Sequence, residues 1–240
     1  MITIRNAHFH HQAEGTVVDA KLFISAIAKF ALGALLVGVL LFLPAGTLHW
    51  WQGWLLMGIL FVPMFCAGLV MMAKAPDLLR KRLNAKEKEG EQREVLALSG
   101  IMFIAAFVIS GFGPRFGLPM LPSWASIVGA IIFLIAYALY AEVMRENAYL
   151  SRTIEVQDGQ CVVDTGLYGI VRHPMYSTTV LLFLAIPIVL GSPIAFIIML
   201  AYPPIIAKRI RNEEQVLTAE LAGYAEYTQR IRWRLVPGIW

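Results

Sequence analysis

Charged side chains are scarce in this sequence. Asp, Glu, Lys and Arg make up 15% of its 240 residues, whereas hydrophobic residues make up 58%. A soluble globular domain usually has about 25% charged residues. The shortage of charge argues against a chain that is surrounded by water on all sides, and the excess of apolar residues favours a membrane protein.

Cysteine is scarce as well. Cys66 lies in an apolar stretch and Cys161 in a polar one, and neither belongs to a CxxC or CxxH pair. We therefore expect no disulfide and no metal site. The N-terminal residues lack a compact apolar core followed by a small-residue cleavage site, so we also expect no secretory signal peptide.

Long apolar runs make up much of the chain. Four of them are long enough to cross a bilayer, which takes about 20 helical residues. They cover residues 23–43, 50–73, 95–113 and 124–144. This pattern predicts an all-α polytopic membrane protein with four N-terminal membrane helices in residues 1–144.

A fifth run, at 178–207, is compatible with one long tilted helix or with a hairpin folded at Gly191-Ser192-Pro193. A hairpin places 18 basic residues on one side of the membrane and one on the other, whereas a single crossing gives 12 and seven. Basic residues favour the cytoplasmic side. We therefore expect six membrane helices, with both termini cytoplasmic and hairpin arms of about 15 residues or 22 Å each. The same rule explains the net charge of +4 without a nucleic-acid partner.

Two polar segments flank the predicted hairpin. The first, 142–176, ends in Arg172-His173-Pro174-Met175-Tyr176, just where the apolar run begins. Pro174 suits the first turn of a helix, because its missing N–H would be unpaired there in any residue. The Arg-His pair then lies at a helix N-terminus, where backbone N–H groups favour a carboxylate or another anion.

The second segment, 208–214, continues the last membrane helix into water. Arg209 and Glu213 share one helix face, and Arg211 and Glu214 share another, so both pairs could be ordinary surface ion pairs. The hairpin favours a different reading, because it returns this helix to the face of the membrane that carries the first polar segment.

Together the two segments offer complementary chemistry. They supply a cation for a carboxylate and an acidic group for an amine or for ribose hydroxyls. Tyr168 and Tyr176 add aromatic faces, which attract a positively charged sulfonium. We therefore expect a functional pocket within residues 145–240, in a single membrane domain that comprises the whole chain.

Three segments carry a family resemblance: GLYGIVRHPMYS at 166–177, RIRNEE at 209–214 and GYAEYTQRIRWRLVPGIW at 223–240. Together they resemble the isoprenylcysteine carboxyl methyltransferase family and, more broadly, the membrane methyltransferases that include phospholipid methyltransferases. The resemblance covers roughly residues 140–240. It implies that S-adenosylmethionine is the cofactor and that a lipophilic acceptor reaches the site from the bilayer.

The resemblance also implies site residues. Arg209 corresponds to the substrate-side arginine of the family, and Glu213 has a catalytic as well as a cofactor-binding position. The expected cofactor positions are Gln160, Cys161, Val162, Val163, Tyr168, His173, Pro174, Met175, Tyr176 and Glu213.

Methyl transfer from a sulfonium is a direct displacement, so alignment of the reactants supplies much of the catalysis, up to about 7–11 kcal/mol. An isoprenylcysteine carboxylate as acceptor would be oriented by Arg209. If the acceptor is instead a lipid amine, Glu213 or Glu214 could take its proton. Related membrane enzymes also methylate small thiols.

Two other classes remain open at this stage. A membrane scaffold or small transporter is disfavoured, because Lys29 is the one clear charge inside the predicted spans. An NADPH-dependent membrane reductase would share a related C-terminal architecture, and the sequence contains no dinucleotide-binding glycine fingerprint. The last residues, 233–240, are expected to fold against the cofactor region as a lid or plug.

Overall fold

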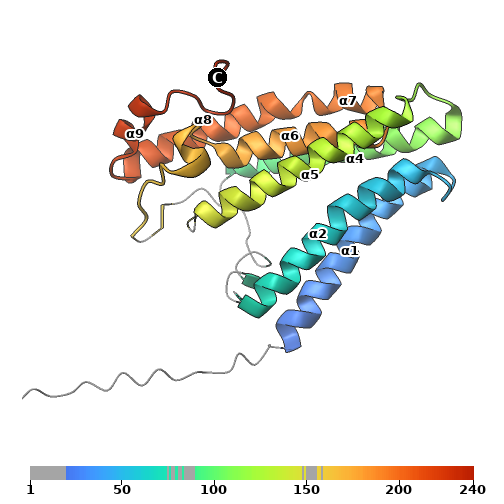
Figure 1. The fold of residues 1–240 in the computed structure, drawn as a ribbon, viewed down its shortest axis with the longest axis horizontal. Helices are drawn as coiled ribbons and strands as arrows, with labels where there is room; N and C mark the ends of the chain where they lie inside the picture. The colour runs from blue at the N-terminus through green and yellow to red at the C-terminus, as the bar shows by residue number, and fades with distance from the viewer. Residues whose placement is uncertain are drawn as a thin grey trace, which may run out of the picture.

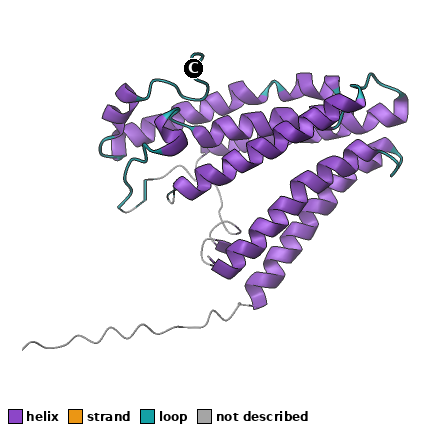
Figure 2. Cartoon of the chain, viewed as in Figure 1, coloured by secondary structure: helices purple, strands orange, loops and turns teal. Residues whose placement is uncertain are grey.

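The structure, a computed structural model, describes residues 20–74, 76, 79–80, 83, 90–147, 149, 156–157 and 159–240, with only the backbone of 90–93. Within these residues all regular secondary structure is helical (Figure 2). The N-terminal tail, which we expect to be cytoplasmic, and most of the residues between 75 and 89 lie outside the described part.

The first four predicted helices are confirmed. They are α1 (Ala20–Ala45), α2 (Trp51–Lys74), α4 (Gly90–Phe116) and α5 (Ser123–Glu146). The helix α4 begins five residues before the predicted start of its apolar run, because its first turn continues into the polar sequence that precedes the membrane.

The predicted hairpin is also present. Its first arm is α6 (Pro174–Val189), which begins at Pro174 rather than at residue 178, and the chain then reverses at Leu190–Ser192. Gly191 has φ +71°, a conformation that side-chain-bearing residues rarely adopt. The Ser192 hydroxyl accepts a hydrogen bond from the N–H of Ala195 and so caps the second arm.

The second arm is divided, which we did not predict. It consists of α7 (Pro193–Met199) and α8 (Tyr202–Glu220). Pro203 and Pro204 explain the interruption, because neither has an N–H to donate and their rings would clash with the carbonyls four residues earlier in a continuous helix. The chain ends with α9 (Tyr224–Arg230) and an irregular segment at 231–240.

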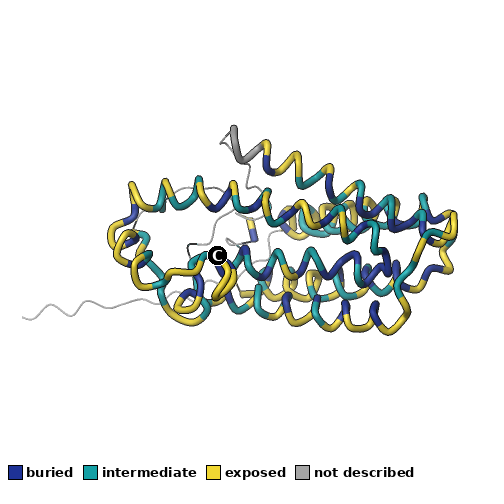
Figure 3. The backbone as a smooth tube through the Cα atoms, turned by 90° about the horizontal axis from the view of Figure 1, so that it is seen from above, coloured by how far each residue is buried: buried dark blue, intermediate teal, exposed yellow. Residues whose placement is uncertain are grey.

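Five helical stretches in the described part are long and apolar enough to cross a membrane: α1, α2, α4, α5 and the run Pro193–Glu220. The shorter α6 is apolar as well. Exposed residues recur along these helices (Figure 3), and many are large and apolar, including Leu35, Val62 and Ile131. The chain is therefore a multi-pass integral membrane protein whose outer surface suits lipid.

The helices α4 to α8 lie alongside one another, whereas α1 and α2 form a pair that diverges from them toward Ala20 and Lys74 (Figure 1). The helices α5 and α6 approach each other closely. A Cβ atom at Gly129 of α5 would lie 2.8 Å from the backbone nitrogen of Val189, so only glycine allows this approach. Small residues commonly permit such contacts between membrane helices.

Lys29, the charge predicted inside a span, has a partner. Its Nζ donates a hydrogen bond to the carbonyl of Leu83 at 2.6 Å, in the segment that follows α2. The side chains of Leu22, Met72 and Leu79 pack together in the same region. Lys29 therefore has a hydrogen-bond partner in the segment that follows α2.

Candidate active site

The segment Arg172–Tyr176 enters α6 in the manner that Pro174 predicts. Pro174 occupies the first turn, and His173 is the N-cap residue. The N–H groups of Arg172 and His173 donate to the carbonyls of Trp233 and Arg234, at 2.8 and 3.0 Å. The backbone before α6 is therefore held in place by the segment that follows α9.

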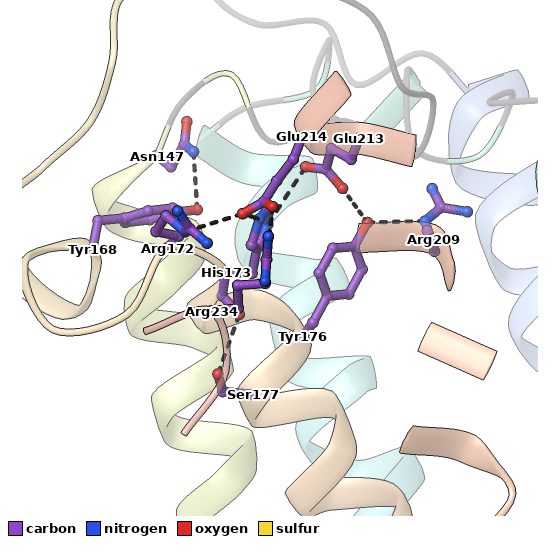
Figure 4. Close-up of polar contacts among 10 residues, drawn as sticks. All are labelled: Asn147, Tyr168, Arg172, His173, Tyr176, Ser177, Arg209, Glu213, Glu214 and Arg234. Atoms are coloured by element: carbon purple, nitrogen blue, oxygen red, sulfur yellow. Dashed lines mark hydrogen bonds and ion pairs between the residues drawn. The ribbon is translucent and has the colours of Figure 1, made fainter. Parts of the chain in front are cut away.

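The two polar segments converge, as the hairpin predicts (Figure 4). Tyr176 lies between two charged groups of α8: its hydroxyl donates to Glu213 Oε2 at 2.5 Å and accepts from Arg209 Nε at 2.9 Å. His173 Nδ1 lies 4.0 Å from Glu213 Oε1. Arg209 is 9% exposed, so this chain of contacts is largely shielded from water.

Glu214 has a separate set of partners. Its Oε1 lies 3.0 Å from Arg172 Nε and 3.2 Å from His173 Nε2, and its Oε2 accepts from Arg234 Nε at 2.7 Å. The glutamate side chain is 12% exposed. Glu213 and Glu214 therefore contact residues just before α6 and in its first turn. These contacts join two segments of the chain, so the glutamates are not merely surface ion-pair partners within α8.

A cavity opens beside Glu213. Its volume is about 110 Å³, and further space beside it is continuous with solvent. Typical small-molecule pockets measure about 300–1,000 Å³, so the enclosed part alone is smaller than such a pocket. It lies between α8, α9, the start of α6 and the loop before η1 (Gly166–Gly169). Among the described residues, no group of His, Cys, Asp and Glu side chains forms a metal site.

Most of the residues expected from the resemblance line this cavity. They are Gln160, Cys161, Val162, Val163, Tyr168, His173, Met175, Tyr176, Arg209 and Glu213. Pro174 is the exception, because it is fully buried in the first turn of α6 and shapes the backbone there.

Sequence reasoning missed several lining residues. They are Asn147, Tyr149, Arg172, Leu217, Leu221, Tyr224 and Tyr227. A signal for two of them was available: Arg209, Glu213, Leu217 and Leu221 recur every four residues and so continue one helix face. Asn147 and Tyr149 carry no such pattern, because they lie in the irregular chain after α5.

Two tyrosines bring polar groups to the inner wall of the cavity. Burial raises the pKa of Tyr168 to about 12, so its hydroxyl remains protonated at neutral pH. Asn147 Nδ2 donates to that hydroxyl at 2.9 Å, which leaves the O–H of Tyr168 able to donate in turn. The hydroxyl of Tyr224 is buried without a hydrogen-bond partner among the described residues, a costly state that a polar ligand would relieve.

The segment 233–240 folds back beside the cavity, but its residues do not line it. The expected lid or plug is therefore wrong in position. The segment instead contacts the outer side of the residues that line the cavity, through Arg172, His173 and Glu214.

Comparison with known proteins agrees with these features. The model of the isoprenylcysteine carboxyl methyltransferase (ICMT) family matches residues 127–219, from α5 to the end of α8. A solved structure of the eukaryotic intramembrane Ras methyltransferase ICMT aligns over 91% of this chain and 85% of its own, at 16% identity and a TM-score of 0.50. A sequence comparison with curated proteins gives no match. Residues 127–219 are therefore similar to the isoprenylcysteine carboxyl methyltransferase family, and the fold of the chain is similar to that of the solved ICMT structure.

Proposed function

We propose that the protein is an S-adenosylmethionine-dependent methyltransferase that acts at the membrane on the carboxylate of an isoprenylated cysteine or a closely related lipophilic acceptor. The observation that carries the proposal is the single cavity in which His173, Tyr176, Arg209 and Glu213 meet. The family match and the shared fold support it.

The residues of the cavity fit the cofactor. Glu213 and the unpaired hydroxyl of Tyr224 suit its amine and ribose hydroxyls, and the faces of Tyr168 and Tyr176 suit a sulfonium. The apolar side chains of the cavity suit the adenine ring. When bound, S-adenosylmethionine would supply a methyl group on a positively charged sulfur, which is a good leaving group.

Arg209 is the group best placed for the acceptor. It lines the cavity, and its Nε donates a hydrogen bond to the Tyr176 hydroxyl, which is a neutral partner. A guanidinium can hold a carboxylate through two parallel hydrogen bonds. Arg209 would therefore orient an acceptor carboxylate without forming a covalent intermediate.

The same arginine disfavours an amine acceptor, because a protonated amine would be repelled by the guanidinium. An amine would also need Glu213 as a proton acceptor, and that carboxylate already accepts a hydrogen bond from Tyr176. A phospholipid amine or a small thiol is therefore the second candidate for the acceptor. The match to a methyltransferase family disfavours an NADPH-dependent reduction as the reaction.

The first test is binding. We would titrate S-adenosylmethionine and S-adenosylhomocysteine into the purified protein in detergent by calorimetry, with NADPH as a control ligand. His173→Ala and Glu213→Ala are expected to weaken binding. Glu220→Ala, at an exposed position at the end of α8, is the matched control and is expected to bind as the wild type does. Folded wild-type protein that binds neither compound would overturn the proposal.

The second test identifies the acceptor. Methyl transfer would be measured with a farnesylated cysteine analogue, a phospholipid amine and a small thiol. We expect transfer to the prenylated carboxylate and a large loss of that transfer in Arg209→Ala. Transfer to the amine or the thiol alone would replace the proposed acceptor while keeping the reaction class.

A further inference from the structure

The segment after α9 is attached to the cofactor side of the site by its backbone. Trp233 and Arg234 accept hydrogen bonds from the N–H groups of Arg172 and His173. The carbonyl of Leu235 accepts a third, from Ser177 Oγ at 2.7 Å. These contacts join residues about 60 positions apart, and they fix the extended backbone that leads into α6.

The segment is also closed on itself. The backbone oxygen of Trp240 accepts hydrogen bonds from the N–H groups of Arg234, Leu235 and Val236, at 2.9, 2.9 and 3.2 Å. The guanidinium of Arg234 lies 5.2 Å from the Trp240 ring, within the range of a cation–π contact. Leu235 is buried against the core that includes Tyr202 and Ile206. Arg234 is therefore presented from a well-anchored loop.

From that loop Arg234 reaches Glu214. Its Nε lies 2.7 Å from Glu214 Oε2, while the other carboxylate oxygen faces Arg172 and His173. Each carboxylate oxygen thus has its own partners. Arg234 and Glu214 do not line the cavity, whereas Arg172 and His173 do. Any effect of the Arg234 side chain on a ligand is therefore indirect, and Glu214 is the residue through which that side chain contacts Arg172 and His173.

We propose that Arg234 is a positioning residue for cofactor binding: by holding Glu214 in one orientation, it fixes Arg172 and His173 at the wall of the cavity. This inference rests on the proposed function of the site. Loss of the Arg234 contact would let the Glu214 carboxylate rotate, and His173 and Arg172 would lose a fixed acceptor. A charged hydrogen bond is directional, so its loss loosens the groups behind it.

The test compares three variants for binding of S-adenosylhomocysteine by calorimetry, with the melting temperature recorded for each. Arg234→Gln is expected to weaken binding about fivefold or more, within the usual range of coupling between linked sites. Arg234→Lys, which keeps the charge, is expected to recover part of the affinity. Arg232→Gln, an exposed arginine two residues away, is expected to bind as the wild type does.

A purely structural role would give another result. In that case Arg234→Gln would lower the melting temperature but bind S-adenosylhomocysteine as Arg232→Gln does, and the inference would be overturned. If Arg234→Gln cannot be purified folded, Ser177→Ala decides, because it loosens the same segment without changing any charge. Weaker binding by Ser177→Ala supports the inference, and wild-type binding overturns it.

A double-mutant cycle that combines Arg234→Gln with Glu214→Gln tests whether Arg234 acts on binding through Glu214. If Arg234 acts through Glu214, the two substitutions together should weaken binding by much less than the product of their separate effects. Independent effects would overturn the inference. Absence of binding by the wild-type protein is a different outcome, because it contradicts the proposed function itself.

Discussion

Tyr176 has an unusual position at the scale of single residues. It is buried, and its one hydroxyl contacts both Arg209 and Glu213. A hydroxyl can do this because it donates and accepts at the same time. Tyr176 thereby links a cation and an anion of the same helix face, and all three residues line the cavity.

We expect Tyr176→Phe to lower kcat/KM about 10–100-fold, because hydrogen bonds to charged groups contribute about 1.5–3 kcal/mol each. Without the hydroxyl, Arg209 and Glu213 would lose the group that orients them. The matched control is Tyr202→Phe, whose hydroxyl makes only a 3.5 Å contact with Thr179. Equal activity in both variants would show that the Tyr176 hydroxyl has no role.

Substitution of Glu214 should mainly lower stability, whereas substitution of Glu213 should mainly lower cofactor affinity. Glu214→Ala removes the shared partner of Arg172, His173 and Arg234, and we expect the melting temperature to fall by about 4–8 °C. Glu213→Ala is expected to change the melting temperature less and the cofactor affinity more. Thermal unfolding in detergent compares the stability of the two variants, and calorimetry compares their affinity for the cofactor. A larger loss of stability in Glu213→Ala would contradict this assignment.

The raised pKa of Tyr168 predicts that the protein loses stability at alkaline pH. Burial raises its pKa to about 12 from the usual tyrosine value of about 10, so the fold favours the protonated form. Its contribution to stability is therefore complete below pH 10 and is lost as the pH rises from about 10 to about 12. Burial shifts the pKa of Tyr227 in the same direction.

The measurement is the melting temperature of wild-type protein and Tyr168→Phe at a series of pH values above 9. We expect the wild type to lose stability more steeply than the variant, because phenylalanine has no proton to lose. Parallel curves would show that Tyr168 does not contribute to the alkaline transition.

At the scale of helices, the contact between α5 and α6 positions the site, because α6 carries His173 at its start. Gly129→Val would place a branched side chain against the backbone at Val189 and force the helices apart, at a cost of about 1–3 kcal/mol or more. We expect less folded protein and a lower melting temperature. Gly100→Val in α4 is the control, because a Cβ there meets nothing within 4 Å. Equal destabilisation would mean that helix propensity, not packing, is responsible.

The elements were predictable to different degrees. The first four helices followed from apolar length alone, and the hairpin followed from where Lys and Arg lie, because both signals are local properties of the sequence. The division between α7 and α8 was missed although Pro203 and Pro204 are visible in the sequence. Prolines in membrane helices are often tolerated, so their effect depends on the neighbouring helices.

The residues of the site were also predictable to different degrees. The residues that line the cavity along 160–176 and at Glu213 could be inferred from motifs that the resemblance supplies. The partners of Glu214 could not, since Arg234 reaches it through a loop whose path depends on contacts with Ser177 and the core. Sequence spacing on one helix predicts a shared face, but it does not predict which distant segment will cover that face.

At the scale of the whole molecule, the site and the turn between α4 and α5 should lie on opposite sides of the membrane. We expect Cys161, which lines the cavity, and Gln229→Cys in α9 to react with a membrane-impermeant maleimide from the cytoplasmic side. Ser123→Cys, at the start of α5, should react from the other side. The experiment uses sealed vesicles and a Cys66→Ala background.

Cys161 provides an additional readout in the same vesicles. S-adenosylhomocysteine should slow its modification, because the thiol lies at the wall of the proposed pocket, and it should leave Gln229→Cys unaffected. Reaction of Cys161 and Gln229→Cys from opposite sides would refute the hairpin topology, because the hairpin lies between these two positions. Reaction of Cys161 and Ser123→Cys from the same side would mean that α5 does not cross the membrane.

The attachment of residues 233–235 to residues 172–177 also determines when the site can form. Synthesis proceeds from the N-terminus, so α6 and α8 are synthesised before Trp233, Arg234 and Leu235. Until residues 233 and 234 have been synthesised, the N–H groups of Arg172 and His173 lack the carbonyl groups that accept their hydrogen bonds. The wall of the pocket therefore acquires these hydrogen bonds only after residues 233–235 have been synthesised, later than the helices that carry most of the lining residues.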